Sequence, residues 1–134
     1  MTKKRLIFSI IVALVLIQIL PLLLETNPPV VAEPKWNSPQ TRELAKRACF
    51  DCHSNETIWP WLVTLDVFRG RRHLNFSEWV PSQGGRGDGG LDEAVEQIQR
   101  GKMPLANYVS LHPAANLTET EKQQLIDGLS ASGQ

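Results

Sequence analysis

Residues 49–53 of the chain read Cys-Phe-Asp-Cys-His, and they contain the only two cysteines among its 134 residues. The thiols stand three positions apart, and a histidine directly follows the second of them. This spacing is typical of c-type haem attachment, because each thiol can add to one vinyl group of the same porphyrin while the next imidazole reaches the iron. The pattern therefore predicts one covalently attached haem c, held by Cys49 and Cys52 and ligated by His53.

Such a Cys-x-x-Cys pair has three other uses. In an exported protein the two cysteines can form a plain disulfide. A redox-active dithiol is another alternative, although it usually needs a βαβ context that this sequence lacks. Zinc requires further cysteine or histidine ligands, and only His73 and His112 remain to supply them. Haem attachment is favoured, with the disulfide as the main alternative.

Met103 is the favoured candidate for the sixth iron position. It lies in the run Arg-Gly-Lys-Met-Pro at 100–104, and the only other methionine is Met1. A thioether ligand raises the reduction potential of a c-type haem, and the proline that follows restricts the loop. The alternative ligands are His73 and His112, and the position can also be open. In each of these cases Met103 would be an ordinary core residue.

Around this motif the sequence predicts an all-α, cytochrome-c-like haem domain with long loops. Three helices are expected, at 39–48, 91–98 and 119–129, and the first should run straight into the cysteines. Ser38 and Thr118 are the predicted N-caps of the first and third helices, and Gly101 should end the second. The connections at 83–90 and 107–116 are expected to be loops.

The amino-terminal segment is apolar enough to be a membrane anchor or an export signal. Leu6–Leu24 is almost uninterrupted aliphatic sequence, and as a helix it would be about 28 Å long, close to the thickness of a bilayer's hydrocarbon core. The preceding basic residues at 3–5 favour an orientation that sends the rest of the chain across the membrane. Cleavage after Ala32 is the alternative to a retained anchor.

This organisation predicts an anchor or signal segment at 1–25, a proline-rich spacer at 26–37 and a c-type haem domain at 38–134. The haem domain is expected on the periplasmic side of a bacterial inner membrane, attached by a single-pass helix. If the leader is cleaved, the domain is instead secreted into the periplasm.

The charge distribution excludes one class of function. Three of the 14 basic residues precede the apolar run, whereas all 14 acidic residues follow it, so the exported part is mildly acidic. Without a basic patch, no nucleic-acid partner is expected.

Three groups of side chains have two interpretations each. The tryptophans at 59, 61 and 79 are expected to pack around the porphyrin or in the core. The arginines at 69, 71 and 72 either pair with haem propionates or form a solvated basic run. The sequons that begin at Asn55, Asn75 and Asn116 are discounted, because a covalent haem fits bacterial export better.

Taken together, these motifs resemble the bacterial haem-binding domain family of small exported proteins. The resemblance covers nearly the whole exported part and rests on residues 27–29, 48–57, 59–61, 74–79, 101–104, 108 and 112–113. It implies a monohaem, cytochrome-c-like protein. By motif match it implies Cys49 and Cys52 as attachment residues, His53 as the proximal ligand and Met103 as the distal ligand.

A haem with both axial positions filled predicts a one-electron carrier that meets redox partner proteins briefly. No general acid/base pair or nucleophile stands beside the motif, so an enzyme is not expected. The alternative is a haem-based sensor or ligand-binding module with a displaceable distal ligand. A third possibility is a haem-free helical domain with a Cys49–Cys52 disulfide.

Overall fold

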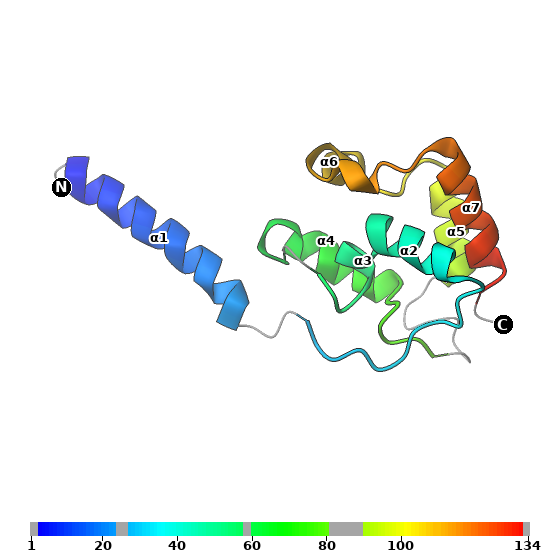
Figure 1. Cartoon of the computed structure of the whole chain (residues 1–134). Coiled ribbons are helices and arrows are strands. Elements are labelled where there is room, and N and C mark those ends of the chain that lie inside the picture. The colour runs from blue at the N-terminus through cyan, green and yellow to red at the C-terminus, as the bar shows by residue number, and fades with distance from the viewer. Residues whose placement is uncertain (1–2, 24–26, 58–59, 81–89, 133–134) are drawn as a thin grey trace.

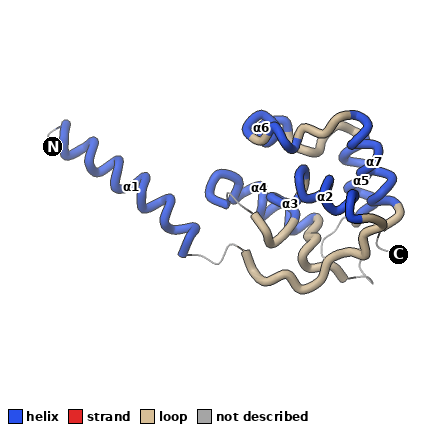
Figure 2. The backbone as a smooth tube through the Cα atoms, in the orientation of Figure 1, coloured by secondary structure: helices blue, strands red, loops and turns tan. Residues whose placement is uncertain are grey.

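Helices form the regular secondary structure of the chain, as its sequence predicts. The computed structural model of the protein describes residues 3–23, 27–57, 60–80 and 90–132, with the backbone alone at 18–23 and 60–64. Its helices are α1 (Lys3–Leu23), α2 (Pro39–Ala48), α3 (Phe50–His53), α4 (Pro60–His73), α5 (Leu91–Gln99), α6 (Ala106–Leu111), the 3-10 helix η2 (Pro113–Ala115) and α7 (Glu119–Ser130) (Figure 1). Loops connect them, and no described residue is drawn as a strand in Figure 2. The all-α prediction is confirmed.

The three predicted helices have the capping residues that the sequence indicates. The Ser38 hydroxyl accepts the backbone N–H of Thr41 at 3.2 Å and so caps α2. Thr118 and Glu121 form the predicted capping box of α7, with reciprocal bonds of 3.2 and 2.8 Å. After α5 the chain turns at Gly101, whose φ of 65° suits glycine because a side chain is disfavoured there.

The structure corrects the expected layout in three places. The first helix ends at Ala48, directly before Cys49, as expected, but Cys49, with φ −128° and ψ −36°, is followed by the short α3, which the sequence analysis did not predict. The sequence analysis did not predict α4; of its described apolar side chains, Leu65 and Phe68 are exposed and Val67 is buried. The loop expected at 107–116 contains most of α6 and all of η2. No residue of α6 is fully buried.

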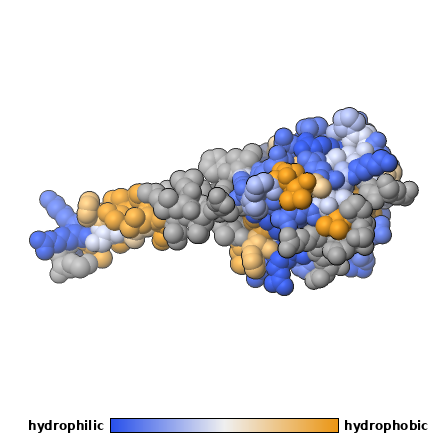
Figure 3. Space-filling view, turned by 90° about the horizontal axis from the view of Figure 1, so that it is seen from below, coloured by the Kyte–Doolittle hydropathy of each residue, from blue (hydrophilic) through white to orange (hydrophobic). Residues whose placement is uncertain are grey.

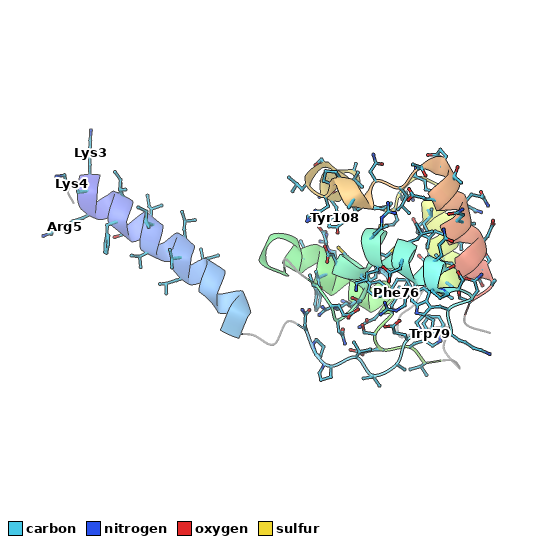
Figure 4. All side chains as sticks on the ribbon, in the orientation of Figure 1. Lys3, Lys4, Arg5, Phe76, Trp79 and Tyr108 are labelled. Carbon is cyan, nitrogen blue, oxygen red and sulfur yellow. The ribbon has the colours of Figure 1, made fainter. Side chains whose placement is uncertain are left out.

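The core lies where α2, α3, α5 and α7 meet the segment after α4. Its buried apolar residues are Leu44, Ala45, Ala48, Phe50, Leu74, Phe76, Trp79, Leu91, Ile98, Leu117, Leu125 and Leu129. Trp36 joins Phe50 and Phe76 in an aromatic group, with ring centroids 6.1 and 5.2 Å away. Figure 4 shows Phe76 and Trp79 below α2. Trp79 is therefore a core residue, whereas Trp59 and the side chain of Trp61 lie outside the described residues.

The helix α1 extends away from the other helices, and its nearest neighbour among them is α4 (Figure 1). Its described apolar side chains are exposed and give the hydrophobic stretch of Figure 3. Lys3, Lys4 and Arg5 lie at its free end (Figure 4). The sequence predicts a membrane-spanning helix here; among the described residues, no helix combines the length and the apolarity that crossing a membrane requires.

The segment expected to be a spacer lies against the domain over its described residues, 27–37. The backbone N–H of Val31 donates to Ser77 O at 2.8 Å, and Trp79 N–H donates to Ala32 O at 3.0 Å. Glu33 accepts two hydrogen bonds from the Arg42 guanidinium, at 2.7 and 2.6 Å. These bonds make the segment part of the folded domain's surface.

Candidate functional site

A cavity of about 430 Å³ brings together residues from α3, α4, α5 and the loop after α5. Three of the predicted site residues line it, namely Cys49, His53 and Met103. Its apolar walls include Ala48, Leu74, Phe76, Ala94, Ile98 and Leu105. A volume of this size and a mostly apolar lining are typical of a site for a cofactor or other small ligand.

A second, much smaller cavity adjoins the first on the side of α6. Its volume is about 30 Å³, and Cys52 lines it together with Cys49, His53, Met103 and Tyr108. Cys49, His53 and Met103 line both cavities and Cys52 lines the smaller one, so all four predicted site residues lie around neighbouring cavities, although Met103 follows the cysteines by about fifty positions.

The imidazole of His53 is oriented by the backbone. Its Nδ1 lies 3.1 Å from the carbonyl oxygen of Leu74, and a carbonyl only accepts, so Nδ1 carries the proton. Burial lowers the pKa of His53, which favours the neutral ring. A neutral ring protonated at Nδ1 keeps the lone pair of Nε2 for a metal ion, and metal-binding histidines are commonly oriented in this way.

Gly70 allows α4 to pack closely on residues 49–53, which carry the predicted attachment motif and are called the attachment turn below. A Cβ at this position would collide with the backbone carbonyl of Cys52. The tight contact between α3 and α4 brings the carbonyl of Leu74, just beyond α4, to the His53 ring. The glycine therefore contributes to the orientation of the predicted proximal ligand.

Both thiols are free, so the structure contains no Cys49–Cys52 disulfide. Burial raises the pKa of Cys49 to about 12 and that of Cys52 to about 11, and both are therefore protonated at neutral pH. A redox-active dithiol needs the opposite, a lowered thiol pKa. Within the described residues no three His, Cys, Asp or Glu side chains gather to hold a metal ion, which gives the zinc alternative no support.

The three candidates for the distal ligand lie in different surroundings. Met103 is half-buried against the core and lines both cavities. His73, on α4, also lines the larger cavity, although its side chain is exposed. His112 lines neither of the two cavities; its ring stacks on Tyr108, with centroids 4.3 Å apart.

The three arginines of α4 have different contacts in the structure. Arg71 donates to Ser54 O at 2.7 Å and to Thr57 Oγ1 at 3.0 Å, so it fixes the chain after the attachment turn. The Arg72 guanidinium lies over the ring of Phe68, 5.8 Å from its centroid. Arg69 alone of the three lines the larger cavity, and it is the one placed to meet an anionic group there.

A buried polar network that sequence reasoning missed supports the attachment turn. Asn75 donates to Asn55 Oδ1 at 3.0 Å, and Asn55 N–H donates to Ser77 Oγ at 2.9 Å. Next to them, Phe76 N–H donates to the carbonyl of His53 at 2.8 Å. Asn55 and Asn75 are only 4% and 3% exposed, so these two sequons are inaccessible in the folded chain. Their pairing joins positions twenty residues apart, which no local pattern indicates.

The residues of the region fit a haem. They offer an imidazole with a fixed tautomer, a thioether, two protonated thiols, apolar walls and one cavity-lining arginine. Imidazole and thioether are among the axial ligands that proteins use for haem iron.

Comparison with known proteins supports the same cofactor. No curated protein and no solved structure matched the chain. The model of the haem-binding domain family matches residues 12–131, which include the attachment turn, both cavities and the whole core. The chain therefore belongs to the haem-binding domain family.

Proposed function

We propose that this protein carries one covalently attached haem c and acts as a one-electron carrier rather than as an enzyme. The observation that carries the proposal is the cavity of about 430 Å³ that Cys49, His53 and Met103 line together. When bound, the haem supplies reversible one-electron oxidation and reduction of its iron.

The residues of the chain have separate roles in this proposal. Cys49 and Cys52 would each hold the haem through one thioether bond, formed by adding S–H across a vinyl group, and His53 and Met103 would bind its iron. Arg69 would pair with a propionate. The apolar walls would exclude water from the iron, and with two protein ligands on the iron the site would have little room for a substrate.

We further propose that the haem domain stands on the periplasmic side of a bacterial inner membrane, with the amino-terminal segment as a retained anchor. The long aliphatic run after the basic residues 3–5 supports this orientation. Cleavage after Ala32 would remove Asn27 and Val31, which hydrogen bond to Thr57 and Ser77. Retention of the segment keeps these contacts, and a redox partner then meets the domain outside the cytoplasm.

Mass spectrometry of the denatured protein tests the attachment. The full chain should be produced in a host that matures c-type cytochromes, beside a Cys49→Ser, Cys52→Ser double variant. The wild type should retain the added mass of one haem after denaturation, and the variant should have the polypeptide mass alone. A wild-type chain with only the polypeptide mass, two hydrogens lighter through a disulfide, would overturn the proposal.

Absorption spectroscopy tests the carrier function. The ferric protein should show the weak red band of sulfur–iron ligation, and the ferrous protein should not bind carbon monoxide readily. A high-spin spectrum that responds to carbon monoxide would instead favour a ligand-binding module.

A further inference from the structure

We propose that the hydrogen bond between Tyr108 and Asp51 is a latch that positions Met103 as the sixth iron ligand and so keeps outside ligands away from the iron. The inference rests on the proposed function, since it concerns how the predicted distal ligand is held. It assigns a positioning function to two residues that do not themselves bind the iron.

The geometry joins the two halves of the site. The Tyr108 hydroxyl donates to Asp51 Oδ2 at 2.7 Å, across 57 positions of sequence. Asp51 lies inside the attachment turn, between the two cysteines, whereas Tyr108 lies on α6, five residues after Met103. Figure 4 shows Tyr108 between α6 and the helices α3 and α4. The bond therefore ties the loop that carries the distal ligand directly to the turn that carries the proximal one.

Few other contacts hold α6 in place. No residue of α6 is fully buried, and among the described elements its backbone comes close only to η2. The segment is fixed before Met103, where Lys102 N–H donates to Gln97 O at 3.0 Å, and after it, where Arg47 donates to Ala114 O at 3.2 Å. Between these two points, the Tyr108 hydroxyl donates the hydrogen bond that joins α6 to the attachment turn.

The ring of Tyr108 is itself held in the orientation that this bond needs. It stacks on the His112 ring at an interplanar angle of 17°, and His112 N–H and Nδ1 lie 2.9 and 3.2 Å from Tyr108 O. The small cavity next to the cysteines is lined by Asp51, Tyr108 and the run Met103-Pro104-Leu105. Met103 N–H donates to Gln97 O at 3.3 Å, and its side chain packs against the core. Release of the hydroxyl would loosen the run at its α6 end, and the sulfur of Met103 would then be held less firmly at the cavity.

The latch predicts that its loss will expose the sixth position to added ligands. The haem-loaded full chain should be titrated in its ferric form with imidazole, which competes with a methionine sulfur. Tyr108→Phe keeps the stacked ring and removes only the hydroxyl. We expect it to bind imidazole about tenfold more tightly than the wild type and to lose intensity in the red band, since a hydrogen bond to a charged acceptor contributes about that factor.

A double-mutant cycle separates the latch from a general loosening of the fold. Asp51→Ala should raise imidazole affinity as Tyr108→Phe does, and the double variant should show no further increase. Ser110→Ala is the matched control, because it removes a hydroxyl of α6 that bonds only locally, to Asn107 O at 2.7 Å. Its imidazole affinity should equal that of the wild type. Should Tyr108→Phe fail to fold, Asp51→Ala gives the same comparison with the tyrosine in place.

Amide hydrogen exchange gives a readout independent of the iron, since residues 103–111 should exchange faster in both single variants. A wild type with the red band, together with variants unchanged in band and imidazole affinity, would overturn the latch and leave the proposed function intact. A wild type without the band would instead overturn the assignment of Met103, and the latch with it.

Discussion

Nδ1 of His53 lies 3.1 Å from the carbonyl oxygen of Leu74, so the residue just beyond α4 orients the imidazole that ends the attachment motif. Two residues after Leu74, Phe76 N–H donates a second hydrogen bond to His53, to its backbone carbonyl oxygen at 2.8 Å. The predicted proximal ligand is therefore oriented by a segment more than twenty positions further along the chain. Such outer contacts of a metal-binding histidine commonly change metal affinity 10- to 100-fold.

His53→Ala should remove the low-spin, six-coordinate spectrum of the haem-loaded chain, because the imidazole lone pair is lost. Ser110→Ala is the control and should keep the low-spin spectrum, because its hydroxyl bonds locally to Asn107 O at 2.7 Å and the residue lines neither cavity. A low-spin spectrum in His53→Ala would show that the proximal ligand is a different residue.

Met103→Ala should abolish the red sulfur–iron band and lower the reduction potential, since a thioether ligand raises it. His73→Ala should retain the band, although His73 also lines the larger cavity. Spectra and redox titrations of both variants make the comparison. If Met103→Ala keeps the wild-type spectrum and His73→Ala loses it, the distal ligand is the histidine of α4.

Gly70→Ala should destabilise the domain by about 2 kcal/mol, the usual cost of overpacking, because the new Cβ would collide with the backbone carbonyl of Cys52. Urea unfolding of the haem-loaded chain measures the change. Thr120→Ala, at an exposed position of α7, should have almost no effect. Equal stability of Gly70→Ala and the wild type would contradict the close contact between α3 and α4.

Asn55→Ala should cost about 2 kcal/mol of unfolding free energy, because it leaves the buried Asn75 amide without the acceptor it has in the wild type. Asn116→Ala changes an asparagine that also begins a sequon but is exposed, and we expect a change close to zero. Thermal or urea unfolding of the two variants decides the point, and equal losses would argue against a buried network.

The acid stability of the domain should depend on Glu121. The hydrogen bond from Arg47 and the capping bonds of Thr118 hold the pKa of Glu121 at about 2, below its usual 4.5. A carboxylate with a lowered folded-state pKa stabilises the fold above pH 4.5, and this contribution is lost as the pH falls towards 2. The unfolding free energy of Glu121→Gln, measured at a series of pH values, should therefore fall less steeply than that of the wild type between pH 4.5 and 2. Arg47→Ala should also make the unfolding free energy depend less on pH over this interval. If neither variant differs from the wild type in this dependence, the prediction is refuted.

Prediction from sequence succeeded where the signal is local. The caps at Ser38 and Thr118 and the turn at Gly101 depend on neighbouring residues alone, and so their helix boundaries could be expected. It failed for α4 and α6, because two of the described apolar side chains of α4, Leu65 and Phe68, are exposed and α6 has no fully buried residue. Both helices are held by contacts with the attachment turn, at Gly70 and Tyr108, rather than by their own pattern.

The sequence by itself determined the attachment motif, because the order and spacing of Cys49, Cys52 and His53 are properties of one turn of chain. Only the tertiary structure decided which distant side chains meet that turn. It brings Met103 to the cavity, leaves His112 outside it, and distinguishes the cavity-lining Arg69 from its two neighbours. The physical reason is that these choices depend on the packing of helices far apart in sequence, and spacing along the chain does not specify which of their faces meet.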